Sequence, residues 1–262
     1  MNNSDKQLLV KNYFDALPEN KFPNELKSRA TVMLSGSAGW GIKEGSDQRA
    51  DWDIHVLLSD EDYLAVSKKY GNDYVIDDRE HAPVVFCQIH NKKWLQERLL
   101  GKDTAVLYLW IYTRGLFIQD KIDVEPLVSE CRKGFLEKLP ELQKNFHIQF
   151  SVRRLDTASC AGRGIMSGTG VNRGEMVKAA LQTFSLIHGE PYPYNKWLAK
   201  HVRQLSEDGG RLVELCEQCL FETDFPKIVK LAKDLRDFME SAMEKAVGKE
   251  RWIHYWWEFN KN

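Results

Sequence analysis

The sequence lacks long apolar runs and a large net charge. No stretch of about 18 consecutive apolar residues occurs, so no transmembrane helix is expected. Residues 1–6 lack the apolar core of a secretory signal peptide, which predicts a cytoplasmic protein with no membrane partner. Lys and Arg total 37 against 38 Asp and Glu, a formal net charge of −1, so the chain has no general attraction to nucleic acid.

Cysteine is also scarce. The 5 cysteines are odd in number and mostly stand in apolar contexts, which predicts free thiols in a reducing compartment. Cys216 and Cys219 are spaced like a metal-binding or redox pair, but no second Cys or His pair stands near them in the sequence. Their helical context favours packing. The chain also has no internal repeat and no low-complexity tract.

The composition is that of a globular protein. The 262 residues, 43% hydrophobic and 11% aromatic, suffice for one large domain or two modest ones. Strand and helix patterns alternate up to residue 123, and helical patterns follow almost throughout. This shift predicts an α+β protein, with a mixed sheet and flanking helices in residues 1–123 and an all-helical bundle in residues 124–262.

The first part predicts a small sheet. Apolar runs and alternation predict strands over 30–34, 51–58, 74–78, 84–89 and 115–120. Helical spacing predicts helices over 6–16, 60–70 and 91–100, with Asp5, Ser59 or Asp60, and Asn91 as their N-caps. Residues 105–112 are apolar and fit either a helix or a strand.

The second part predicts helices only. They cover 124–137, 140–158, 173–188, 194–205, 210–220 and 224–246, with a short one within 249–259. The glycine-rich residues 161–175 are expected to form a flexible loop, which is either a cover over a substrate or a plain connector. The aromatic residues Trp252, Tyr255, Trp256, Trp257 and Phe259 are expected in the bundle core or a dimer contact.

One stretch of the first part carries the chemistry. The predicted strand 30–34 runs into Gly36-Ser37, where the glycine permits close approach of a ligand and the serine offers a hydroxyl and an amide N–H. Asp51 and Asp53 open the next apolar strand, and alternation puts both carboxylates on one face. Two carboxylates suit Mg²⁺ together with substrate phosphates. Each feature alone is common, but the combination predicts a nucleotide and metal site.

Gly36-Ser37 followed by Asp51-Trp52-Asp53-Ile54 resembles the signature of the DNA polymerase beta-like nucleotidyltransferase superfamily. The chain looks like its small two-domain bacterial members, such as the aminoglycoside and lincosamide nucleotidyltransferases. The resemblance implies that Asp51 and Asp53 hold two Mg²⁺ ions, and that Gly36 and Ser37 cradle the phosphates of ATP or another nucleoside triphosphate. It covers the N-terminal half, because the C-terminal half is similar only in being helical, with a stretch at 192–198 like that of uncharacterised members.

The resemblance also implies a third carboxylate on a neighbouring strand, and Gln88 stands at its position. A glutamine can ligate a cation weakly through its carbonyl oxygen but cannot accept a proton. The chain is therefore an engineered Glu→Gln variant, a natural protein whose base is Glu175 or Glu190, or a protein that binds nucleotide without turnover. A different alignment of the strand would instead assign the acid to Asp77, Asp78 or Glu80.

Several cationic residues are candidates for holding the triphosphate. Lys43 and Arg49 lie in the gap of the motif, and Lys178 and Lys196 lie in the helical half. Each of them also fits a solvated surface charge. Trp40 stands where related antibiotic-modifying enzymes often carry a basic residue, and packing is favoured over base stacking as its role.

Together these features predict transfer of a nucleoside monophosphate, AMP from ATP, to a hydroxyl of a small acceptor. The proposed acceptor is a small molecule such as an aminoglycoside-type antibiotic, which would make the activity one of antibiotic resistance. A lincosamide, a metabolite, a protein side chain and tRNA stay open as acceptors. Asp51 and Asp53 would bind the metal, with Gln88 and Glu175 near the acceptor. A monomer or homodimer is expected. Two other classes stay open: a catalytically impaired nucleotide-binding regulator and a toxin–antitoxin-type interaction protein.

Overall fold

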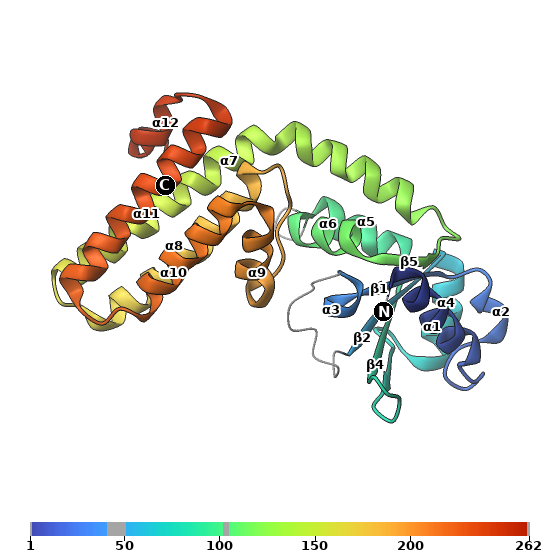
Figure 1. Cartoon of the computed structure of the whole chain (residues 1–262). Helices are drawn as coiled ribbons and strands as arrows, with labels where there is room; N and C mark the ends of the chain where they lie inside the picture. Colours follow the sequence, from blue (N-terminus) through green and yellow to red (C-terminus); the bar gives the residue numbers. More distant parts are fainter. Residues whose placement is uncertain (1, 41–50, 102–104, 261–262) are drawn as a thin grey trace. The chain divides into compact units, whose positions relative to one another are not determined.

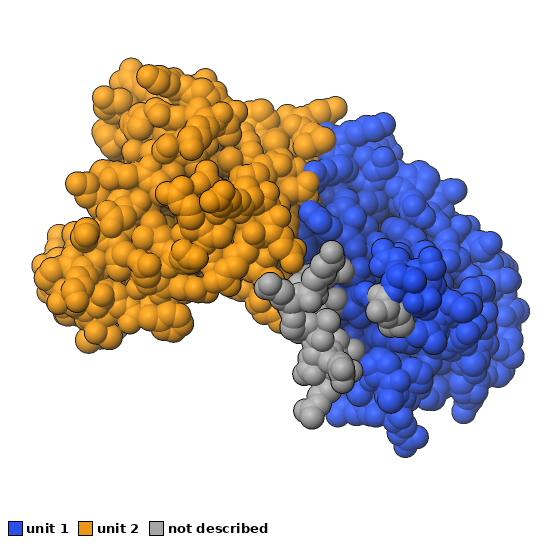
Figure 2. Space-filling model, viewed as in Figure 1, with its two compact units in different colours: residues 1–133 blue, residues 134–262 orange. Residues whose placement is uncertain are grey.

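The computed structural model describes residues 2–40, 51–101 and 105–260. The chain divides into two compact units, Met1–Lys133 and Gly134–Asn262, coloured separately in Figure 2. The limit between them falls inside helix α7, Val124–Gly162, whose first residue follows directly on the boundary expected from the sequence. No helix among the described residues is long and apolar enough to cross a membrane.

The fold is α+β, and the described strands lie in the first unit (Figure 1). The strands are β1 Thr31–Ser35, β2 Trp52–Leu58, β3 Val75–Asp78, β4 Val85–Asn91 and β5 Leu116–Gln119. They form one sheet in the order β3-β4-β2-β1-β5, in which β2 and β4 are parallel and the other neighbours antiparallel. The sheet is therefore mixed, as predicted.

One face of the sheet forms the core of the first unit. Alternate apolar side chains of β1, β2 and β4, among them Val32, Ile54 and Cys87, pack against Val10 and Phe14 of helix α1, Asn3–Ala16. Burying each such large side chain contributes about 1.5–3 kcal/mol. Because strand side chains alternate, Asp53, His55 and Gln88 belong to the opposite face.

The remaining helices of the first unit are short. They are α2 Asn24–Lys27, α3 Gly36–Gly39, α4 Asp60–Tyr70, α5 Lys92–Leu100 and α6 Ala105–Arg114. Ser59 and Asn91 cap α4 and α5 through their side-chain oxygens, as predicted. The predicted cap Asp5 is wrong: Asn2 caps α1, and Asp5 completes a reciprocal capping box three residues later. Residues 105–112 are helical.

The second unit is entirely helical among its described residues. After α7 come α8 Met166–Ile187, α9 Asn195–Leu205, α10 Glu207–Phe221, α11 Phe225–Val247 and α12 Arg251–His254, with a 3₁₀ turn at Trp256–Glu258. Cys216 and Cys219 lie in the core among these helices, and burial raises the pKa of the Cys219 thiol to about 11. Trp252 packs with Met243 and Ile253 in a smaller core cluster, so this aromatic residue serves packing.

Two expected interruptions of the helices are wrong. Pro140 lies inside a continuous α7, although its missing N–H removes a backbone hydrogen bond. Buried side chains on both sides of it, Phe135 before and His147 after, keep the helix packed. Of the glycine-rich residues 161–175, only 163–165 lie outside a helix, because α7 ends at Gly162 and α8 begins at Met166. Packing thus overrides the weak helical propensity of these residues.

Alanine substitutions at two glycines of α8 should have opposite effects on the free energy of unfolding. A Cβ at Gly168 would lie 2.9 Å from Cys160 Sγ and 3.3 Å from Ile165 Cγ2, whereas a Cβ at Gly170 meets nothing within 4 Å. We expect Gly170→Ala to raise the free energy of unfolding by about 0.5–1 kcal/mol through helix propensity. We expect Gly168→Ala to lower it by about 1–3 kcal/mol through overpacking. Urea titrations of both variants test this, and equal shifts would contradict it.

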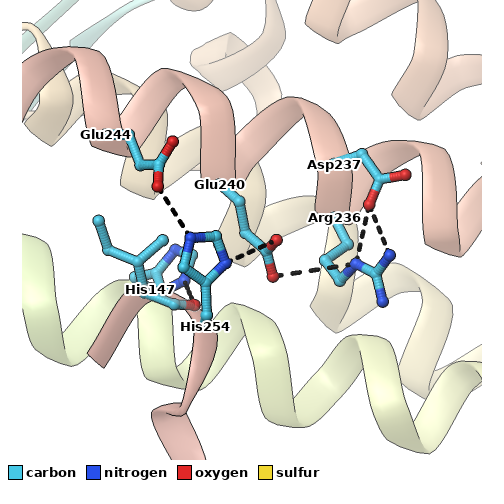
Figure 3. Close-up of polar contacts among 7 residues, drawn as sticks. His147, Arg236, Asp237, Glu240, Glu244 and His254 are labelled. Atoms are coloured by element: carbon cyan, nitrogen blue, oxygen red, sulfur yellow. Dashed lines mark hydrogen bonds and ion pairs between the residues drawn. The ribbon is translucent and has the colours of Figure 1, made fainter. Parts of the chain in front are cut away.

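A polar cluster fixes α12 on α11 (Figure 3). The two ring nitrogens of His254 lie 3.1 Å from Glu240 Oε2 and 2.9 Å from Glu244 Oε1. Behind it, His147 Nε2 lies 3.0 Å from the Ile253 carbonyl oxygen. A histidine can donate from both nitrogens only when it is protonated, so this geometry favours the imidazolium.

This cluster makes stability depend on pH. The hydrogen bond to Glu244 and the charge of Glu240 raise the pKa of His254 above its usual 6.5. When the pKa of a histidine is higher in the folded than in the unfolded state, the folded state is stabilised fully at pH values below the unfolded-state pKa. This stabilisation is lost as the pH rises through the folded-state pKa. We therefore expect the difference in unfolding free energy between the parent and His254→Gln to shrink as the pH rises above the usual histidine pKa of about 6.5. Denaturant titrations at a series of pH values measure it, and a constant difference would refute the pairing.

Candidate functional site

The two halves of the sequence motif meet at one end of the sheet. Ser35, the last residue of β1, pairs with Asp53 of β2, and its hydroxyl donates to the Asp53 carbonyl oxygen at 3.2 Å. Gly36 follows with a φ of +66°, in the left-handed region. A Cβ placed on Gly36 would lie 2.1 Å from Asp53 Oδ2. The Asp53 carboxylate therefore lies directly against the glycine, in space that a side chain would occupy.

The turn after Gly36 is held in place from several sides. A Cβ on Gly39 would lie 2.3 Å from the Leu34 carbonyl oxygen, so the turn also approaches its own strand closely. Lys6 of α1 donates to the Ala38 carbonyl oxygen at 2.6 Å. Trp40 packs edge-on against Trp110, with ring centroids 4.3 Å apart, which agrees with the packing role favoured for it. Ser37 lies within α3, on the same turn as Gly36.

Asp51 lies just before β2 and is exposed to solvent. It is two residues from Asp53, and alternation along an extended chain would direct both carboxylates to the same face. Arg49 and Lys43, the candidate phosphate ligands of the gap, lie outside the described residues. The described part of the motif thus provides one carboxylate packed against the turn and a second one open to solvent.

The strand register places Gln88 one row away from Asp53. Gln88 pairs with His55, while the residue level with Asp53 on β4 is Phe86. Since paired residues of adjacent strands share a face, Gln88 lies on the face of Asp53, displaced by two residues along the strand. No carboxylate therefore faces Asp53 from β4.

The register also distinguishes the alternative candidates for the third carboxylate, Asp77, Asp78 and Glu80, by their position relative to Asp53. Asp77 of β3 pairs with Phe86, so it lies in the same row as Asp53 and on the same face, two strands away, or about 9–10 Å by strand spacing. Its carboxylate is 2.9 Å from Arg79 Nε. Asp78 belongs to the opposite face, where it accepts from Tyr13 at 3.1 Å. Glu80 follows the end of β3. Asp77 is the alternative that the geometry favours.

A buried histidine next to Asp53 was not predicted. His55 is almost fully buried, and the hydroxyl of Tyr112 on α6 lies 3.1 Å from its Nδ1. Burial lowers the pKa of His55 to about 4, so its imidazole is neutral at neutral pH. The sequence could have predicted this position of His55, because a residue two positions after Asp53 on a strand points to the same face of the sheet as Asp53.

The candidates from the helical half lie in the second unit. Glu175 and Lys178 form an ion pair of 4.0 Å on α8, with both side chains substantially exposed. Lys196, in the first turn of α9, lies over the Trp197 ring at 5.1 Å from its centroid. Both arrangements fit surface residues. Their participation in a site with Asp53 stays a prediction.

The carboxylates present suit a metal that is shared with a substrate. Among the described residues, no group of three or more His, Cys, Asp or Glu side chains could hold a metal ion. Mg²⁺ needs no such cage, because it is usually bound through one or two carboxylates plus substrate phosphates and water. Asp51 and Asp53 fit that donor set.

Comparisons with known proteins give a distant likeness. No protein-family model matches the chain, and no curated protein sequence matches it. Among solved structures, the chain is similar to a nucleotidyltransferase-like protein from Exiguobacterium sibiricum 255-15. The similarity covers 94% of this chain and 78% of that chain, with a TM-score of 0.42 and 14% sequence identity. A likeness at this level assigns no role to any residue.

Proposed function

We propose that the chain is a nucleotidyltransferase that moves AMP from ATP to a hydroxyl of a small acceptor. The observation that supports this most is the contact of Gly36 with the Asp53 carboxylate. It brings a glycine turn against a carboxylate suited to Mg²⁺. An aminoglycoside-type antibiotic is the acceptor class that follows from the sequence resemblance.

The proposed reaction is an in-line displacement. The acceptor hydroxyl oxygen forms a bond to the α-phosphorus of ATP, the bond to the bridging oxygen breaks, and pyrophosphate leaves. Mg²⁺ ions held by Asp51 and Asp53 would supply charge neutralisation at the phosphates. Gly36 and Ser37 would hold the β- and γ-phosphates through backbone N–H groups. His55, two residues after Asp53 on β2, adds no positive charge near it, because burial keeps the pKa of the imidazole low.

The group that removes the acceptor proton is the open part of the proposal. Gln88 can orient a hydroxyl through its amide but cannot take up a proton. Asp77 lies in the row of Asp53, and Glu175 is the candidate from the second unit. Replacing Asp77 and Glu175 separately by Asn and Gln would show which of them the reaction needs.

The test is release of pyrophosphate from Mg²⁺-ATP, measured for the parent and for Gln88→Glu with aminoglycosides and lincosamides as acceptors. We expect turnover in the parent or, if a third carboxylate is required, in Gln88→Glu only. A gain of about 10²-fold or more would be typical of restoring a general base. ATP binding by neither form would overturn the proposal.

A second function is favoured by Gln88 itself. Without a carboxylate on β4, the site could bind Mg²⁺-ATP without turning it over, which would make the chain a nucleotide-responsive regulator. This alternative predicts Mg²⁺-dependent ATP binding without pyrophosphate release from the parent and from Gln88→Glu. The same assay therefore separates the two functions.

A further inference from the structure

A polar pocket of about 350 Å³ lies in the first unit, away from the Asp53 site. It is formed by α1, α2, the end of β5 and the residues that follow it. Its lining consists of three lysines, Lys11, Lys27 and Lys121, one carboxylate, Asp15, and three neutral residues, Asn24, Ser28 and Gln119. The lining therefore carries a net charge of +2 in a chain whose overall charge is −1. Such a local excess attracts small anions.

The single carboxylate of the lining, Asp15, already forms an ion pair. Lys11 Nζ lies 2.8 Å from Asp15 Oδ2, an i, i+4 pair on α1 with both side chains half exposed. Among the described residues, no carboxylate lies within ion-pair distance of Lys27 or Lys121. The pocket thus keeps two ammonium groups without a counter-charge.

The wall of the pocket is fixed by hydrogen bonds. Lys27 Nζ donates to the carbonyl oxygens of Asp15, at 2.8 Å, and Leu17, which leaves one of its three N–H groups for a ligand. Gln119 Nε2 donates to the carbonyl oxygens of Lys27 and Ala30, both at 2.8 Å. A cation held in this way does not have to lose much side-chain entropy when an anion binds.

The pocket and the Asp53 site lie at opposite ends of the same strands. Ser35 pairs with Asp53 at one end of β1, while Thr31 pairs with Leu57 at the other. Gln119 of the pocket pairs with Val32, beside that second end. Three residues of extended strand separate Val32 from Ser35, about 10 Å by strand rise. The pocket is therefore a separate place in the first unit.

We propose that this pocket binds the phosphate group of a small molecule. Ammonium groups are suitable ligands for phosphate as point charges, and the volume exceeds what one phosphate ion fills. Asn24 and Ser28 can hydrogen-bond the uncharged part of a phosphomonoester. This proposal is independent of nucleotidyl transfer, because it requires neither Mg²⁺ nor Asp53.

The experiment compares three probes with a chelator present: inorganic phosphate, pyrophosphate and glucose 6-phosphate. Calorimetric titrations use the parent, the double variant Lys27→Gln/Lys121→Gln, and a control with the same loss of charge, Lys68→Gln/Lys93→Gln on exposed positions of α4 and α5. We expect the double variant to bind roughly tenfold more weakly and the control to bind like the parent. Amide NMR shifts should centre on Asn24, Ser28 and Lys121.

The outcomes separate the ligand sources. Tighter binding of glucose 6-phosphate than of the inorganic anions would identify a phosphomonoester as the ligand, and the reverse order an inorganic phosphate. Equal affinities in the double variant and the control would overturn the proposal, as would shifts confined to other residues. Binding that survives Asp53→Asn but fails in the double variant keeps the pocket distinct from the proposed nucleotide site.

Discussion

Replacement of Asp53 by Asn should abolish the Mg²⁺-dependent part of ATP binding while leaving the first unit folded. The substitution keeps the size and shape of the side chain but removes the charge that a hard cation requires. The bond from the Ser35 hydroxyl to residue 53 uses the backbone carbonyl, so it is kept. Loss of several kcal/mol of charge stabilisation corresponds to roughly 10²–10³-fold weaker binding or slower turnover.

The measurement is ATP affinity with Mg²⁺ and with a chelator, for the parent, Asp53→Asn and Glu61→Gln. Glu61 is an exposed acid in the first turn of α4, so its replacement changes the net charge equally without touching the turn at Gly36. The parent and Glu61→Gln should respond to Mg²⁺ alike, and Asp53→Asn should not respond. An unchanged response in Asp53→Asn would remove the basis of the proposed function, whatever the acceptor is.

Local sequence signals predicted the part of the site that lies on neighbouring elements. A strand, a Gly-Ser turn and an acid-rich strand entrance were enough to expect the turn and the carboxylates in one place, and the structure has Asp53 against Gly36. Alternation alone also assigned Asp53 to one face of the sheet. The caps Ser59 and Asn91 are local signals of the same kind, since each depends on a side chain three residues from its partner N–H.

Long-range pairing was not accessible from one sequence. The position of Gln88 relative to Asp53 depends on the register of β4 against β2, which is set by packing over the whole sheet. The contact of His55 with Tyr112 joins residues 57 positions apart. The continuity of α7 through Pro140 likewise depends on tertiary contacts of its buried side chains, which outweigh the local cost of a proline.

Replacement of Gly36 by Ala should test two roles of this glycine: its left-handed backbone conformation and its close contact with the Asp53 carboxylate. The backbone at residue 36 has a φ of +66°, which an L side chain adopts at a cost of about 1–2 kcal/mol. The new Cβ would also lie 2.1 Å from Asp53 Oδ2. Because this atom is the end of a flexible side chain, the carboxylate can move away without unfolding the strand. The loss should therefore be larger in Mg²⁺-ATP binding than in stability.

Gly71→Ala is the matched control. Gly71 has a φ of +97°, but a Cβ there meets nothing within 4 Å, so the variant carries the backbone strain alone. In urea titrations Gly36→Ala should lose about 1–2 kcal/mol. Gly71→Ala should lose about 1–3 kcal/mol, because its φ of +97° with a ψ of 162° is a conformation that is essentially restricted to glycine. Only Gly36→Ala should weaken Mg²⁺-dependent ATP binding, by roughly tenfold or more, since a displaced ligand disrupts the geometry on which a metal site depends. Equal effects of the two variants on ATP binding would mean that the contact between Gly36 and Asp53 serves only to close the turn.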